Sequence, residues 1–178
     1  RKVAEGQYHA TVLAEAGIRR MEMEHLVTQW LPLDLMLPAP GQGALAVQCR
    51  ADDETTLALL AAIEDDGVRT AVTAERTFLK SLGGACSAPI AAYAKINREP
   101  VLRNVEVGAE NAEILLEALV ASTDGKQIIK VTGQGNDPVM LGKQLAAQAT
   151  AQGADHILSA LQSEIQNPKS EIAGKRIV

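Results

Sequence analysis

Cys86 is the residue whose type and setting best suit covalent chemistry. It lies in the segment 82–90, LGGACSAPI, where small neighbours leave its sulfur approachable, as a nucleophile or a tethered group requires. The local pattern alone still favours an inert, partly buried thiol, because free cysteines are commonly buried. The second cysteine, Cys49, has no such loop around it and is interpreted as a packing residue.

No other group of side chains has the spacing of a catalytic or metal site. The three histidines, His9, His25 and His156, are scattered without the spacing of metal ligands, so we expect no metal. The paired acidic residues have the positions of helix caps or of solvated helix faces. The adjacent Glu75 and Arg76 are interpreted as helix-capping or domain-packing residues without a catalytic role.

The composition excludes several classes of function. The 178 residues carry a net charge of −5, which argues against nucleic-acid binding, and only 2% are aromatic, too few for a base-stacking platform. Two cysteines are too few for a disulfide framework and indicate a reducing cytoplasm. Without a long apolar run or a secretion signal, we expect no membrane partner. Because the chain starts at Arg1, we expect its natural amino terminus to lie outside it.

A helix and a strand are predicted on either side of Cys86. The helix begins near Val68 and ends at Gly83-Gly84, since glycine tolerates the left-handed conformation of a helix end. A strand follows over 89–96. The apolar side of the helix is predicted to consist of Val72, Leu79 and Leu82.

Further strands and helices complete a small domain after this strand. Strands are predicted over 114–121 and 127–132, joined by a hairpin turn at Asp124-Gly125. Asp137-Pro138 opens a helix that Gly153 ends, and a short helical turn covers 157–161. These elements predict an antiparallel sheet with helices on one face, and a polar, linker-like stretch over 162–174.

The chain before this domain gives a more broken pattern. A buried strand is predicted over 8–14, a helix over 15–23, a stretched connection over 31–43 and a strand over 44–48. Asp52 or Asp53 can cap a helix that ends near 65–67. The pattern is typical of a crossing between two domains.

Three motifs, in this order, resemble porphobilinogen deaminases: PAPGQGA at 38–44, TAER at 73–76 and LGGACSAPI at 82–90. The likeness extends from about Lys2 to Leu161 and includes AEAGIRR at 14–20. In that family the cysteine of this loop forms a thioether to a dipyrromethane, which stays attached while four porphobilinogen units are added head to tail. The resemblance therefore implies that Cys86 holds a covalent dipyrromethane cofactor.

The function that the resemblance implies is that of a hydroxymethylbilane synthase, a transferase of tetrapyrrole and heme biosynthesis. Porphobilinogen loses ammonia to give an electron-poor methylene pyrrole, and a soft sulfur nucleophile captures such a carbon as a stable link. A serine would be a poorer trap than Cys86.

The resemblance also implies binding roles for other residues. The pyrrole carboxylates need guanidinium groups at fixed places, and Arg20 matches one of the family's arginines, whereas Arg19 stands at a position without that role. Gly41, Gln42 and Gly43 match the inter-domain segment whose backbone and glutamine amides approach the cofactor. The same segment also suits a hinge for domain movement.

The family's catalytic aspartate lies in an amino-terminal part outside this chain, so the resemblance implies no catalytic residue here and an inactive isolated chain. The implied partners are porphobilinogen, the growing pyrrole oligomer and the missing amino-terminal half. We expect the parent protein to be a monomer, and the isolated chain to expose apolar surface and self-associate.

The predicted fold class is α/β, with an α+β C-terminal domain whose small antiparallel sheet is covered by helices. The resemblance implies that two fragments of periplasmic-binding-protein-like α/β domains precede it: 1–37 from domain 2, then 38–66 with the inter-domain crossing and a returning segment of domain 1. Residues 67–161 form the cofactor-carrying domain 3. Residues 162–178 are a linker or the start of a fused domain, because IAGKRIV at 172–178 resembles the opening of uroporphyrinogen-III synthases. An ordinary polar tail explains this match equally well.

A different class of function also agrees with these residues. In a non-enzymatic module that binds an anion or a partner protein, Arg20 and the glycine segment would hold the ligand and Cys86 would only pack. This alternative predicts no covalent pyrrole. An enzyme with another cysteine mechanism is a weaker alternative, because no Cys/His/Asn set or oxyanion motif accompanies Cys86.

Overall fold

The computed structural model describes residues 1–83, 88–97 and 113–166, the last five of these through their backbone only. The chain forms two compact units, Arg1–Met36 and Leu37–Val178, which are described separately below. Within the described ranges, no helix is both long and apolar enough to cross a membrane.

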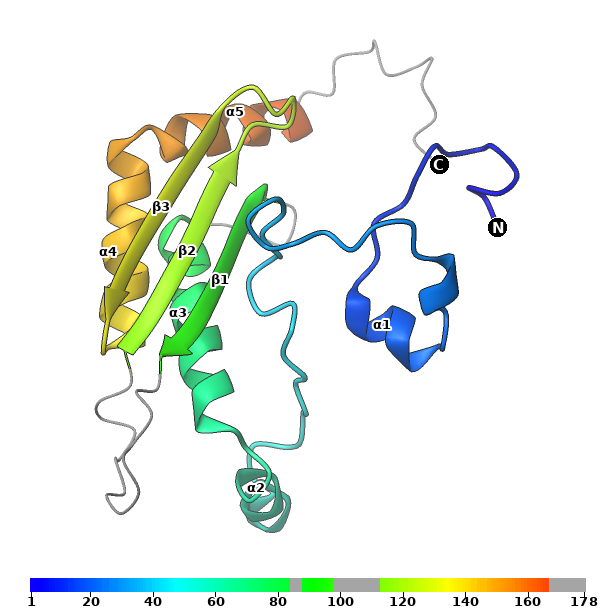
Figure 1. Cartoon of the computed structure of the whole chain (residues 1–178). Coiled ribbons are helices and arrows are strands. Elements are labelled where there is room, and N and C mark those ends of the chain that lie inside the picture. Colours follow the sequence, from blue (N-terminus) through cyan, green and yellow to red (C-terminus); the bar gives the residue numbers. More distant parts are fainter. Residues whose placement is uncertain (84–87, 98–112, 167–178) are drawn as a thin grey trace. The chain divides into compact units, whose positions relative to one another are not determined.

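A three-stranded antiparallel sheet is the centre of the larger unit (Figure 1). Its strands are β1 (Ile90–Asn97), β2 (Glu113–Ala121) and β3 (Ile128–Gly135), in the order β1-β2-β3. The register places Ala118 of β2 between Ala92 of β1 and Val131 of β3, and all three side chains are buried. The antiparallel sheet and the predicted fold class are confirmed.

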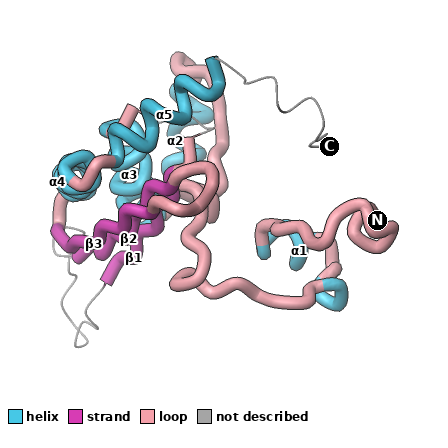
Figure 2. Tube along the Cα trace, turned by 90° about the horizontal axis from the view of Figure 1, so that it is seen from above, coloured by secondary structure: helices cyan, strands magenta, loops and turns pink. Residues whose placement is uncertain are grey.

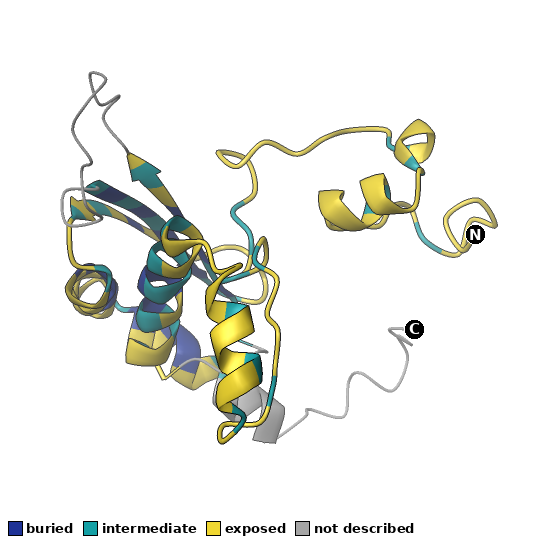
Figure 3. Cartoon of the chain, turned by 90° about the horizontal axis from the view of Figure 1, so that it is seen from below, coloured by how far each residue is buried: buried dark blue, intermediate teal, exposed yellow. Residues whose placement is uncertain are grey.

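Helices cover one face of this sheet (Figure 2). They are α3 (Asp66–Ser81), α4 (Pro138–Ala151) and α5 (Ala154–Gln166). The buried side of the strands faces the helices (Figure 3), because alternate residues of a strand point to the same face. The largest fully buried side chains in this core are Phe78, Ile114, Leu116, Val120 and Leu145.

The predicted helix caps and turns are present. Asp137 caps α4 by accepting hydrogen bonds from the N–H groups of Val139 and Met140, at 2.8 and 2.9 Å. Asp53 caps α2 (Glu54–Ala61) by accepting from Thr56 N–H at 3.1 Å. The chain leaves α3 through Gly83, whose φ is +66°. These features depend on neighbouring residues alone, which is why the sequence predicts them correctly.

The strands predicted over 8–14 and 44–48 are wrong. Both segments lack regular structure and are largely exposed, with Leu45 97% and Val47 65% exposed. A strand needs a neighbour to accept its backbone hydrogen bonds, and neither segment pairs with another within the described residues. The helix predicted over 15–23 is shorter, as α1 (Glu15–Arg20), and is followed by the 3₁₀ helix η1 (Glu24–Leu26).

Two predictions about the larger unit also need correction. The fully buried side of α3 consists of Ala74, Glu75 and Phe78, whereas the predicted Val72, Leu79 and Leu82 are only partly buried, although Leu79 and Leu82 do pack against the core. This happens because α3 contacts both β1 and α4, so its buried side lies where the two meet. Helix α5 continues to Gln166, so the linker-like stretch begins as helix. The tail motif at 172–178 lies outside the described residues.

Candidate functional site

Cys86 lies in the segment 84–87, outside the described residues, but both ends of that segment are described. On one side, Gly83 donates its N–H to the carbonyl oxygen of Lys80 at 3.0 Å, which closes the end of α3. On the other side, the Pro89 carbonyl oxygen accepts the N–H of Ala121 at 3.0 Å, which joins the entry of β1 to β2. The ends of the cysteine segment are therefore anchored to a helix and to the sheet.

The predicted glycine segment, Gly41-Gln42-Gly43, forms a tight turn in the same unit. Gly41 has a φ of +76°, a left-handed conformation that favours glycine, and its N–H donates to Glu75 Oε2 at 2.6 Å. The Gln42 N–H donates to the Ala39 carbonyl oxygen at 3.0 Å. Gln42 and Gly43 are exposed, so the Gln42 side-chain amide is accessible to a ligand, whereas the Gly41 N–H is already occupied.

Glu75 connects this glycine segment to the sheet. Its side chain reaches from the middle of α3, and its Oε1 accepts the N–H of Ala94 in β1 at 2.8 Å while Oε2 accepts that of Gly41. The residue is only 6% exposed. Burial raises the pKa of Glu75, and the hydrogen bonds from Ala94 and Gly41 only partly offset this effect.

These two hydrogen bonds are not evident from the sequence. Of the two roles predicted for Glu75, helix capping is wrong, because Glu75 lies in the middle of α3 and instead binds backbone N–H groups far away in the sequence. The predicted packing role is not contradicted. One signal was available, because Glu75 shares a helix face with Ala74 and Phe78, both of which are fully buried. A glutamate on a buried face needs hydrogen-bond donors close to it.

Arg20 and Arg19 end α1 in the smaller unit and differ in their partners. The Arg19 guanidinium binds the Glu15 carboxylate at 2.7 Å and lies over the Trp30 ring, 5.5 Å from its centroid. Arg20 is exposed, and within the described residues its side chain forms no ion pair or hydrogen bond. The predicted carboxylate-binding arginine therefore has its guanidinium free. Arg20 and the glycine segment belong to different units, so each is placed within its own unit only.

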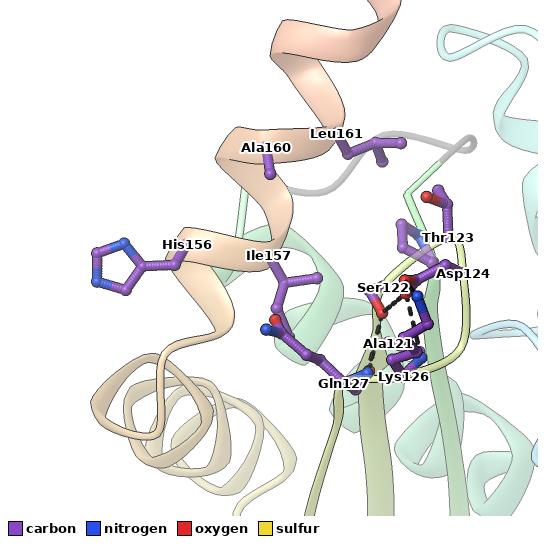
Figure 4. Close-up of a pocket in the computed structure, with 11 residues that line it drawn as sticks. Ala121, Ser122, Thr123, Asp124, Lys126, Gln127, His156, Ile157, Ala160 and Leu161 are labelled. Carbon is purple, nitrogen blue, oxygen red and sulfur yellow. Dashed lines mark hydrogen bonds and ion pairs between the residues drawn. The ribbon is translucent and has the colours of Figure 1, made fainter.

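A hollow of about 500 Å³ lies beside Pro89, between the β2–β3 turn and α5 (Figure 4). The polar groups of the turn bind one another: Ser122 Oγ contacts Asp124 Oδ1 at 2.6 Å, and Lys126 Nζ lies 3.2 Å from Asp124 Oδ2. The Ser122 hydroxyl and then Lys126 hold the pKa of Asp124 below its usual value. Figure 4 shows His156 pointing away from this group. Ser122, Asp124 and Lys126 thus stabilise the turn, and no residue that lines the hollow belongs to the predicted site.

In the part of the chain that the structure describes, no three His, Cys, Asp or Glu side chains come close enough together to bind a metal ion. In the smaller unit, the exposed Arg20 guanidinium, which has no partner within the described residues, can bind an acidic group. In the larger unit, the exposed Gln42 amide can donate and accept hydrogen bonds, while the Glu75 carboxylate is occupied by backbone.

Two family models match this chain. The model described as "Porphobilinogen deaminase, dipyromethane cofactor binding domain" matches residues 1–58, and "Porphobilinogen deaminase, C-terminal domain" matches residues 69–151. The two matches follow one another along the chain, and the segment of Cys86 lies inside the second.

Curated proteins named porphobilinogen deaminase match most of the chain. The protein from Brevibacillus brevis is 48% identical over 159 residues, which cover 89% of this chain and 48% of the relative. The protein from Staphylococcus carnosus is 42% identical over 164 residues, covering 92% of the chain and 49% of the relative. That from Halalkalibacterium halodurans is 41% identical over 168 residues, covering 94% and 50%. The chain thus spans about half the length of the curated relatives it matches.

Proposed function

Because the chain belongs to the porphobilinogen deaminase family, we propose that it serves in a hydroxymethylbilane synthase. This transferase joins four porphobilinogen units, with loss of ammonia, in tetrapyrrole and heme biosynthesis. The observation that carries the proposal is the match of both family models in order, together with 41–48% identity over about nine-tenths of the chain.

Cys86 is the proposed attachment site of a covalent dipyrromethane cofactor. When bound, this group supplies the terminal pyrrole to which the next unit is joined. The glycine segment suits contact with such a group, because the Gln42 amide is exposed and Gly43 has no side chain to block a ligand. A thiol that must be free to form a thioether also supports a reducing, cytoplasmic setting.

Arg20 is the proposed binding site for a pyrrole carboxylate. A guanidinium pairs with a carboxylate through two parallel hydrogen bonds, provided that no other acidic group holds it. This condition separates the two neighbours, since Arg19 is engaged by Glu15 and Trp30 and Arg20 is free within the described residues. The structure thus supports the assignment of Arg20 over Arg19.

The remaining half of the relatives' length is the proposed partner of residues 1–65. Large apolar side chains of this region are exposed, including Leu13 (64%), Leu45 (97%), Val47 (65%) and Leu59 (68%). Exposed apolar surface of this extent marks a binding face, and further polypeptide of the same protein is the nearest source of cover. We therefore also propose that the isolated chain is inactive and self-associates, whereas the complete protein is a monomer.

The proposed function is tested by measuring the mass of the protein purified from its natural source. The expected result is an added mass equal to one dipyrromethane, which disappears in Cys86→Ala and persists in the matched control Cys49→Ala. Consumption of porphobilinogen should be lost with the same substitution.

Two outcomes would contradict the proposal. A wild-type protein without added mass and without porphobilinogen consumption would instead favour a module that binds an anion or a partner. Loss of the added mass in Cys49→Ala, with retention in Cys86→Ala, would move the attachment site.

A further inference from the structure

Glu75 joins three parts of the chain that are distant in the sequence. Its two carboxylate oxygens have separate partners, Ala94 N–H at 2.8 Å and Gly41 N–H at 2.6 Å. Because the residue is only 6% exposed, water competes little for these bonds. One side chain of α3 therefore fixes both an edge of the sheet and the glycine turn.

A second contact fixes the same turn. The Pro38 carbonyl oxygen accepts the N–H of Ala92, two residues before Ala94, at 3.1 Å. A Cβ placed on Gly41 would lie 3.8 Å from Cγ1 of Val72, so the turn also lies against α3. The 38–41 segment is therefore tied to α3 and β1, the elements that hold the two ends of the cysteine segment.

From this arrangement, and resting on the proposed function, we infer that Glu75 is a positioning residue for the transfer reaction. Its carboxylate holds the glycine turn in one place relative to α3 and β1. The exposed Gln42 amide, which follows Gly41 directly, is thereby held in one place relative to the two elements that flank the cysteine segment. Glu75 itself touches no substrate.

The buried carboxylate of Glu75 has a cost in free energy. Burial raises the pKa of Glu75 despite its two N–H donors, so the ionised carboxylate is disfavoured in the folded state. An apolar side chain of similar volume would fill the same space without this cost, but it would also remove the acceptor of the Ala94 N–H. It would leave the turn, too, without its bond to the helix.

Two substitutions at Glu75 and one control substitution test the inference. They are made in the protein as it is purified from its natural source. Glu75→Gln keeps the size but places an NH₂ group against one backbone N–H, so one of the two bonds is lost. Glu75→Met fills the space and removes both bonds while avoiding a buried charge. The control is Glu117→Gln on β2, a partly buried carboxylate that forms no hydrogen bond or ion pair within the described residues.

Three measurements are compared: the mass of the attached cofactor, kcat and KM for porphobilinogen, and amide hydrogen exchange. We expect all variants to keep the cofactor mass and the folded state at the assay temperature. Both Glu75 variants should lose about tenfold or more in kcat with a smaller change in KM, because small misplacements of a binding group cost that much. Amide exchange at residues 41–43 should become faster while β2 remains protected, and Glu117→Gln should match the wild type.

The possible failures are distinguishable. A modified, active wild type whose Glu75 variants turn over at the rate of the control would overturn the inference alone. Loss of folding in both Glu75 variants would assign Glu75 to stability and also overturn it. An unmodified, inactive wild type would overturn the proposed function together with this inference.

Discussion

Residues 66–166 and residues 1–65 use similar local signals with different results. Both regions contain capped helices, yet in the first region Phe78, Leu116 and Leu145 are fully buried, whereas in the second Leu45 is 97% exposed. The difference is the sheet, which gives the helices of the first region a common apolar face to cover. Local chemistry is thus enough to form helices in this chain, but its core lies where strands pair and helices cover them.

Limited proteolysis of the isolated chain should show the largest difference between the two regions. We expect cleavage within 1–36 and 44–65 to be on the order of 10³-fold faster than within β2, β3 and α4, because local opening costs almost nothing in the first ranges, whereas the core opens only with global unfolding. The measurement is the time course of fragment masses. Full protection of 8–48 in a monomeric chain would contradict both this expectation and the need for a covering partner.

Truncation of one leucine in each region should separate them further. Leu116→Ala should lower the free energy of unfolding by about 2–5 kcal/mol, since it leaves a cavity beneath the helices. Leu45→Ala should change it by less than about 0.5 kcal/mol, as is usual for exposed residues. Urea denaturation followed by circular dichroism measures both values. Equal losses of unfolding free energy in the two variants would show that Leu45 is buried in solution.

Removal of one helix cap in each region should give the smallest effect. Asp137→Ala should lower the free energy of unfolding by about 1 kcal/mol, because α4 forms part of the core. Asp53→Ala should leave the main unfolding transition unchanged, since α2 buries none of its residues. Thermal denaturation of the two variants against the wild type is sufficient. A clear shift in the Asp53 variant would place α2 within the cooperative unit.

The sequence predicted most of the elements of residues 66–166 because their signals are local. Asp137 before Pro138, Asp124-Gly125 in the hairpin and Gly83 after a helix each act on residues two to four positions away. The strands over 8–14 and 44–48 were predicted on equally good apolar patterns. They failed because a strand also needs a pairing partner, which a pattern along one segment cannot supply.

For the same reason, some features of the candidate site could be predicted from the sequence and others could not. The glycine turn was found from its motif, and Arg20 remains a prediction that its free side chain supports. The hydrogen bonds of Glu75 were missed because its partners, Gly41 and Ala94, lie 34 and 19 residues away in the sequence. Only the folded chain brings these groups together, so no local pattern identifies the role of the carboxylate.

The contacts of Glu75 and Pro38 also affect how the sheet meets other molecules. The outer edge of β1 carries the N–H groups of Ala92 and Ala94, which could otherwise pair with a strand from another molecule. The Pro38 carbonyl oxygen and the Glu75 carboxylate occupy both groups, so a strand from another molecule cannot bind at these two positions without displacing them. One side chain and one carbonyl oxygen thereby cover part of this edge in place of a fourth strand.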